Sequence, residues 1–186
     1  MKLNTANTLT IIRIAAIPLF VVCFYLPWSW ARPAAAGIFI FAALTDLADG
    51  YIARRWNQTT AFGAFLDPVA DKLIVATALV LLTAADPRLS VAIVAAIIIG
   101  REITVSALRE WMASVGDRTS VAVSFVGKIK TTMQMIGLSL MIMQYDAPGM
   151  DAYTVGYVLL LIAAGLTMWS MWVYMRAAWP ALSRSS

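Results

Sequence analysis

Four aspartates lie in or beside stretches of apolar residues, where ionisable side chains are unexpected. Asp46 and Asp49 are three residues apart, and Asp67 and Asp71 are four apart, so each pair would share one face of a helix. An ionisable residue at membrane depth costs about 2.5–3.5 kcal/mol on insertion scales, so these carboxylates should be paired, protonated or bound to metal. They are therefore the first candidates for chemistry.

The two pairs of carboxylates would converge if their helices were antiparallel neighbours. The polar run Arg54-Arg55-Trp56-Asn57-Gln58 between them suits a short turn that joins such helices. Four convergent carboxylates repel one another, and divalent cations remove that repulsion. Four ligands suffice for two ions about 3.5–4 Å apart, an arrangement that recurs in phosphoryl chemistry. Because the chain contains no histidine and one cysteine, a metal site must be built from carboxylates, which suit Mg²⁺ or Mn²⁺.

Small residues and one arginine accompany these carboxylates. Gly50 and Ala53 leave the helix surface bare beside Asp49, and Gly63 does the same before the second pair, so a ligand could approach the backbone. Arg54 is a permanent cation whose planar fork suits phosphate. Taken singly, each residue also fits a structural role, such as an ion pair between Asp49 and Arg54 or a glycine that serves helix packing. Together, at this spacing, they favour a binding site.

The rest of the chain is strongly apolar. Of its 186 residues, 61% are hydrophobic and 13% are charged, and the mean hydropathy is +0.80. Soluble domains are typically about 45–50% apolar and about 25% charged. The composition therefore predicts a single all-α, polytopic integral membrane domain over residues 1–186. Six transmembrane helices are predicted near residues 8–27, 34–54, 69–85, 89–112, 127–145 and 153–176.

Asp67 and Pro68 predict how the third of these helices begins. Aspartate is a favoured N-cap, and proline is favoured at the first helical position. We therefore expect this helix to start at Pro68, with Asp67 as its cap.

The basic residues predict the orientation in the membrane. If the N-terminus is cytoplasmic, all but Arg32 and Arg88 of the fourteen lysines and arginines fall on or near the cytoplasmic side. Both termini and the aspartates would then be cytoplasmic, and the net charge of +4 does not indicate nucleic-acid binding. A secretory signal within residues 1–36 is less favoured, because Arg13 and Pro18 interrupt the apolar run. Membrane-interface positions are predicted for Trp28, Trp30, Trp169, Trp172 and Trp179.

The aspartate-rich stretch resembles the signature of the CDP-alcohol phosphotransferase family, D-x2-D-G-x2-A-R-x8-G-x3-D-x3-D. All eight fixed positions match at the right spacing, from Asp46 to Asp71. Arg101-Glu102, Ser106-Ala-Leu-Arg109 and Gly127-Lys128-Ile-Lys130 also resemble bacterial members that use glycerol 3-phosphate as the acceptor. The resemblance covers nearly the whole chain.

The resemblance implies a six-helix, homodimeric enzyme of the bacterial cytoplasmic membrane. It would transfer the phosphatidyl group of CDP-diacylglycerol to glycerol 3-phosphate and release CMP, in the biosynthesis of anionic phospholipids. Two Mg²⁺ or Mn²⁺ ions would be shared by Asp46, Asp49, Asp67 and Asp71, and Asp71 would act as the general base. The nucleotide would be bound by Asp46, Asp49, Gly50, Ala53, Arg54 and Gly63.

A phosphorylated acceptor needs cations of its own. Arg101 is predicted at membrane depth and should face a cavity, and Arg109 lies eight residues further on, roughly on the same helix face. Alternatively, these basic residues only anchor the protein to lipid headgroups. The predicted acceptor pocket is formed by Arg101, Arg109, Arg118, Lys128 and Lys130.

Three other functions remain open from the sequence. Another acceptor, such as inositol phosphate or serine, would keep the family and the metal site. A polytopic prenyltransferase also uses aspartates and magnesium, but with different spacing and more helices. A divalent-cation transporter is less favoured, because the four aspartates would all lie at one membrane face, with no acidic layer across the rest of its depth.

Overall fold

The computed structural model describes residues 5–56, 61–114, 125–144, 146–147 and 150–182. Its described residues form six α-helices and a hairpin of two very short strands, in which Asp146 pairs with Asp151. The elements are α1 (Thr5–Tyr25), α2 (Ala31–Trp56), α3 (Ala61–Ala85), α4 (Leu89–Ser114), α5 (Phe125–Met143), β1 (Asp146–Ala147), β2 (Met150–Asp151) and α6 (Ala152–Leu182).

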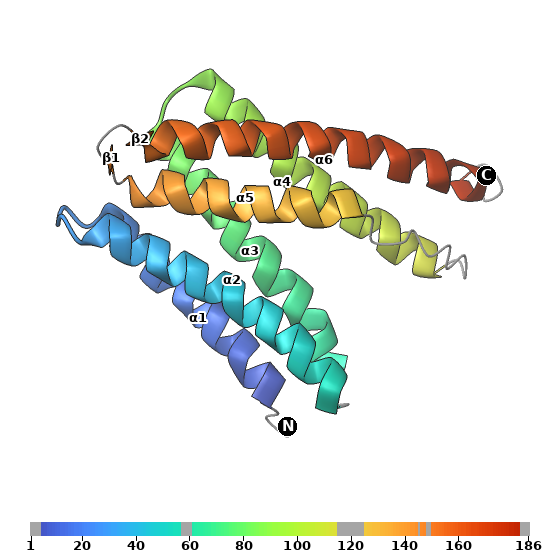
Figure 1. Cartoon of the computed structure of the whole chain (residues 1–186). Coiled ribbons are helices and arrows are strands. Elements are labelled where there is room, and N and C mark those ends of the chain that lie inside the picture. Colours follow the sequence, from blue (N-terminus) through green and yellow to red (C-terminus); the bar gives the residue numbers. More distant parts are fainter. Residues whose placement is uncertain (1–4, 57–60, 115–124, 145, 148–149, 183–186) are drawn as a thin grey trace.

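The helices run back and forth between two ends of the molecule (Figure 1). One end, called the hairpin end, carries the α1–α2 and α3–α4 connections together with β1 and β2. The opposite end is called the signature end, because α2 finishes and α3 begins there, close to the signature residues. The start of α1 and the end of α6 lie away from the hairpin end (Figure 1). This arrangement brings the two halves of the signature to the same end of the bundle.

Among the described residues, four helices have the length and composition of membrane spans. In the same part of the chain, α2 and α5 contain shorter apolar stretches, Ala31–Thr45 and Ile129–Met143. The prediction of an all-α polytopic membrane protein is confirmed. Apolar windows long enough to cross a bilayer occur at Thr8–Tyr25, Pro68–Ala85, Leu89–Met112 and Ala152–Arg176, with mean hydropathies of 1.7 to 2.0.

The predicted start of the third helix was wrong. α3 begins at Ala61, so Pro68 lies inside the helix and Asp67 does not cap it. A proline inside a helix removes one backbone hydrogen bond and presses its ring against the carbonyl four residues earlier. Such prolines are tolerated in membrane helices when neighbouring groups satisfy the backbone, and α1 contains one as well, Pro18. As a consequence, both halves of the signature lie on continuous helices.

Small residues let α5 and α6 approach closely. A Cβ atom added at Gly156 would lie 2.7 Å from the carbonyl oxygen of Gly137, and one added at Gly137 would lie 2.8 Å from that of Gly156. Both distances are too short for a side chain, so the two helices pack backbone to backbone at this point. The close approach holds α5, which carries Lys130, in a fixed position against α6.

A polar cluster ties the α3–α4 connection to the start of α6 at the hairpin end. Asp86 accepts hydrogen bonds from Arg88 Nη2 at 2.6 Å and from the hydroxyl of Tyr153. The hydrogen bond from Arg88 is the main reason that the pKa of Asp86 is lowered to about 2. Arg88 Cζ also lies 4.9 Å from the ring centroid of Tyr157. Nearby, Asp151 accepts a hydrogen bond from the backbone N–H of Thr154 at 3.1 Å and so caps α6.

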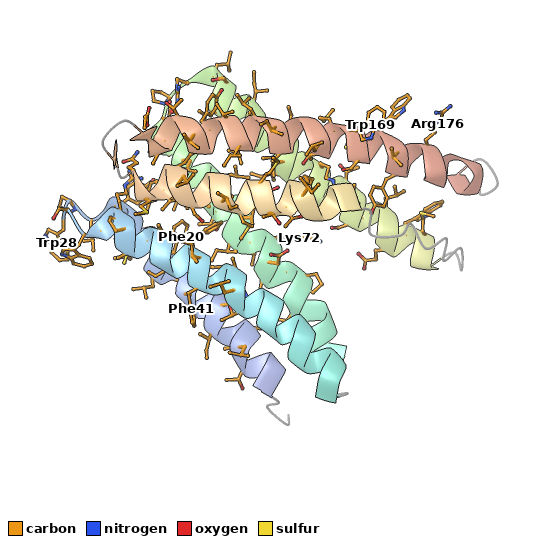
Figure 2. The ribbon with its side chains drawn as sticks, viewed as in Figure 1. Phe20, Trp28, Phe41, Lys72, Trp169 and Arg176 are labelled. Carbon is orange, nitrogen blue, oxygen red and sulfur yellow. The ribbon has the colours of Figure 1, made fainter. Side chains whose placement is uncertain are left out.

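Exposed tryptophans lie toward both ends of the bundle. Figure 2 shows Trp28 at the hairpin end, and Trp169 with Arg176 toward the far end of α6. Trp28 is 54% exposed and Trp169 is 64% exposed, as are Trp30 and Trp172 to similar extents. These positions suit tryptophans at the two membrane interfaces. The side chain of Trp179 lies outside the described residues.

Candidate functional site

The first half of the signature lies on one face of α2. Because α2 is continuous from Ala31 to Trp56, positions 46, 49, 50, 53 and 54 are spaced by three, four, seven and eight residues, which places them along a single helix face. The side chains of Asp46, Asp49, Ala53 and Arg54 lie outside the described part of the structure, so their placement follows from the backbone of α2.

The second half of the signature follows one face of α3. Gly63, Asp67 and Asp71 are spaced by four residues each, so they lie one above another along the helix. Gly63 is buried and Asp71 is exposed, whereas the side chain of Asp67 lies outside the described residues. Only residues 57–60 separate the two helices, so both faces belong to the signature end.

Asp71 lines a cavity of about 180 Å³ that we call the charged cavity. Three helices contribute to it: α3 with Asp71 and Lys72, α4 with Arg101 and Glu102, and α5 with Lys130. The structure thus brings the predicted base together with two of the predicted acceptor-binding cations. The cavity is completed by Val75, Gly127, Thr131, Gln134 and Met135.

Hydrogen bonds connect charged residues of α4 and α5 with one another and with Ser170 of α6. Glu102 Oε1 accepts hydrogen bonds from Arg101 Nη1 at 2.9 Å and from Lys130 Nζ at 3.2 Å. Arg101 Nη2 donates to Ser170 Oγ at 3.2 Å, and Arg101 Cζ lies 5.9 Å from the ring centroid of Tyr174. Charge-assisted hydrogen bonds of this kind hold long side chains in defined positions. The Arg101 guanidinium is therefore fixed at the wall of the charged cavity.

Sequence reasoning missed Lys72 as a site residue. Its ammonium group donates a hydrogen bond to Ser106 Oγ, which links α3 to α4 directly beside Asp71. Figure 2 labels Lys72 on α3. Lys72 follows the last signature aspartate in sequence, and that adjacency was the one available signal. Residues next to each other on a helix point in different directions, so the sequence alone did not place both in one cavity.

The side chains of three predicted acceptor-binding cations lie outside the described residues. Arg109 lies on α4 and Lys128 lies on α5, but their side chains are outside the described residues. Arg118 falls within residues 115–124, which are also outside the described part of the chain. Their roles stay predictions.

A second, apolar cavity of about 460 Å³ also reaches Asp71. We call it the apolar groove. It lies between α2, which contributes Ile40, Ala43 and Leu44, and α5, which contributes Met135 and Ile136 among others. The apolar groove therefore extends between α2 and α5 as far as Asp71 on α3. It is completed by Thr131, Thr132, Ser139 and Leu140.

The donor groups available here suit a hard divalent cation. Among the described side chains no group of three carboxylate, cysteine or histidine residues lies close enough to bind a metal, but three of the four signature aspartates are not in that set. The fourth, Asp71, is exposed and lines both cavities. Because the whole chain lacks histidine, carboxylate oxygens are the natural ligands, and they fit Mg²⁺ or Mn²⁺.

Comparison with known proteins gives a consistent result over the whole length of the chain. The family model described as CDP-alcohol phosphatidyltransferase matches residues 3–174. A protein of Yersinia enterocolitica is 52% identical over 182 residues, which cover 98% of each chain. A protein of Salmonella paratyphi A is 52% identical over 178 residues, or 96% of each chain. Both are named CDP-diacylglycerol–glycerol-3-phosphate 3-phosphatidyltransferase.

Proposed function

The chain belongs to the CDP-alcohol phosphatidyltransferase family, and from this premise we propose its reaction. It transfers the phosphatidyl group of CDP-diacylglycerol to glycerol 3-phosphate, giving phosphatidylglycerophosphate and CMP in phospholipid biosynthesis. The proposal rests on the 52% identity, over 98% of both chains, with a protein named CDP-diacylglycerol–glycerol-3-phosphate 3-phosphatidyltransferase. The complete signature from Asp46 to Asp71 supports it. An all-carboxylate site beside an apolar groove agrees with a lipid donor that carries a pyrophosphate.

The signature aspartates would hold the metal ions. In this proposal Asp46, Asp49, Asp67 and Asp71 bind two Mg²⁺ or Mn²⁺ ions, which when bound neutralise charge on the pyrophosphate of the donor. Arg54 adds a permanent positive charge on the same face of α2 as two of these aspartates. Gly50 and Ala53 leave room for the nucleotide, and Gly63, which is buried in α3, leaves room on the facing side.

The chemical step is a direct displacement. A hydroxyl oxygen of glycerol 3-phosphate forms a bond to the phosphatidyl phosphorus, the bond from that phosphorus to the bridging oxygen breaks, and CMP leaves. Asp71 accepts the proton of the attacking hydroxyl, a role that suits an exposed carboxylate at the junction of both cavities. We assign no covalent intermediate, because the chain contains no histidine and its sole cysteine, Cys23, is buried on α1 in the apolar core.

The charged cavity is the proposed binding site for the acceptor. Arg101 and Lys130 line it beside Asp71, so the phosphate and the reacting hydroxyl of one small molecule could be bound together. Arg109, Arg118 and Lys128 would add further positive charge to the acceptor pocket. Lys72 contributes a third cation to the described lining.

The apolar groove is the proposed path for the acyl chains of the donor. Replacing Ile136 with tryptophan should fill the groove and raise the KM for CDP-diacylglycerol roughly tenfold, while the KM for glycerol 3-phosphate changes little, because only the donor is displaced. The matched control is Val158→Trp, at a similarly exposed position on α6. Steady-state kinetics in mixed micelles measure both constants. Equal effects of the two substitutions on the donor KM would argue against this path.

We also propose the membrane orientation and the oligomeric state of the protein. By the positive-inside rule, the signature end and both termini face the cytoplasm of a bacterial inner membrane, where glycerol 3-phosphate is soluble and CDP-diacylglycerol lies in the bilayer. The protein would act there as a homodimer, as the family resemblance implies.

Release of CMP by the purified protein in detergent tests the function. CDP-diacylglycerol and Mg²⁺ are supplied with glycerol 3-phosphate, inositol phosphate, inositol or serine in parallel reactions. We expect CMP release with glycerol 3-phosphate alone. Release with another acceptor would retain the family and the metal site but reject the assignment of the acceptor. Folded protein that releases no CMP with any of them would contradict the proposed reaction.

A further inference from the structure

The carboxylate of Glu102 lies between two cations that we assign to the acceptor. Its Oε1 atom is 2.9 Å from Arg101 Nη1 and 3.2 Å from Lys130 Nζ. The side chains of Arg101 and Lys130 are 11% and 4% exposed, whereas that of Glu102 is 28% exposed. One oxygen of a partly exposed anion therefore bridges two nearly buried cations that come from different helices.

We propose that Glu102 is a displaceable counter-ion, which takes the place of the acceptor's phosphate in the ligand-free site and thereby sets the affinity for the acceptor. This inference rests on the proposed function, because it assumes that the charged cavity binds a phosphorylated acceptor. An oxygen held by an arginine and a lysine is also the usual arrangement of a bound phosphate oxygen. Buried cations without a counter-ion are strongly destabilising, so a resident carboxylate is needed while the cavity holds no acceptor.

The contacts of Arg101 explain why the cation would stay while the carboxylate leaves. Arg101 is also held by Ser170 Oγ, and Tyr174 lies beside its guanidinium. Its Nε atom is buried and has no hydrogen-bond partner among the described residues, so a donor is left over for a ligand. Glu102 is the most exposed of the three charged side chains and lines the cavity itself. Its flexible side chain can turn away when a phosphate with more negative charge arrives.

A purely structural role for Glu102 makes the opposite prediction. If Glu102 only joined α4 to α5, its loss would loosen Arg101 and Lys130 and weaken the binding of anions. If it competes with the acceptor for these cations, its loss strengthens the binding of anions, because the phosphate no longer has to displace a carboxylate. The sign of the change in affinity separates the two roles.

The experiment compares wild-type protein with Glu102→Gln, which keeps the shape of the side chain and removes its charge. Calorimetric titration with inorganic phosphate measures anion binding without any reaction, and steady-state kinetics give the KM of each substrate. We expect the Kd for phosphate and the KM for glycerol 3-phosphate to fall roughly three- to tenfold, the scale of one partly buried charge pair. The KM for CDP-diacylglycerol should stay at the wild-type value.

Glu110→Gln is the matched control, because Glu110 is an exposed carboxylate on the same helix. A control that tightens phosphate binding as much as Glu102→Gln, or a Glu102→Gln variant with unchanged or weaker binding, overturns the proposal. Should Glu102→Gln fail to fold, Glu102→Asp keeps the charge but shortens the reach to both cations, and the same rise in phosphate affinity is expected. Phosphate titration remains decisive even if the CMP assay contradicts the proposed reaction, so the two failures are distinguishable.

Discussion

Asp71→Asn is expected to abolish CMP release while leaving the binding of CDP-diacylglycerol largely intact. The asparagine amide keeps the size of the side chain but cannot accept the proton of the attacking hydroxyl. Loss of a general base lowers kcat by about 10²- to 10⁴-fold, and the loss of one metal-binding carboxylate can only add to this. Asp71 lines both cavities, so the change acts where the acceptor and the donor meet. The turnover number and a direct titration with CDP-diacylglycerol measure the two effects separately.

Asp151→Asn provides the control for this experiment. Asp151 caps α6 at the hairpin end, and asparagine caps a helix as well as aspartate does, so the control should keep wild-type turnover. A near-normal rate for Asp71→Asn would show that another group takes the proton. Loss of both turnover and donor binding would instead assign Asp71 mainly to metal binding.

The sequence predicted a carboxylate site with a basic pocket beside it, but it did not predict the contacts among these residues. The spacing of the four aspartates indicated a carboxylate site, and a basic pocket was expected beside it. In the structure Asp71, Arg101 and Lys130 line one cavity, although the roles of these residues stay predictions. The bridging position of Glu102 was not predictable, because it depends on the relative placement of α4 and α5 and not on either sequence segment alone.

Pro68 shows where local sequence rules give way to tertiary structure. Proline after aspartate is a strong signal for the start of a helix, and in an isolated segment it would set the first residue of the helix. In this protein α3 begins at Ala61 instead, seven residues before the proline. Hydrogen bonds in an apolar medium are worth more than in water, so an extra two turns of helix outweigh the one bond that Pro68 removes. As a result, Gly63 and Asp71 lie on one continuous helix face.

The contact between α5 and α6 was also beyond sequence reasoning. Neither Gly137 nor Gly156 belongs to a G-x-x-x-G pair, the pattern that most often marks close helix packing in membranes. Single glycines are common in membrane helices and carry no signal of their own. Only the positions of both backbones show that each glycine faces the carbonyl oxygen of the other.

Gly156→Ala should therefore destabilise the fold, and by more than Gly137→Ala, because its new Cβ would meet three atoms within 3.0 Å. The new Cβ would lie 2.7 Å from the carbonyl oxygen of Gly137 and 2.9 Å from Met141 Cγ, so α5 and α6 must separate. Overpacking of this kind costs about 1–3 kcal/mol, which corresponds to a fall of roughly 2–12 °C in the unfolding midpoint for a chain of this size. Thermal unfolding in detergent measures the shift.

Gly165→Ala is the matched control, because it adds the same methyl group to the same helix with nothing within 4 Å of the new atom. Alanine is the better helix former, so the control should unfold at or slightly above the wild-type temperature. Equal midpoints for the two variants would mean that the helices accommodate a Cβ at Gly156 without separating. A lower midpoint for Gly156→Ala together with reduced turnover would link this contact to the site, because α5 supplies Lys130 to the charged cavity.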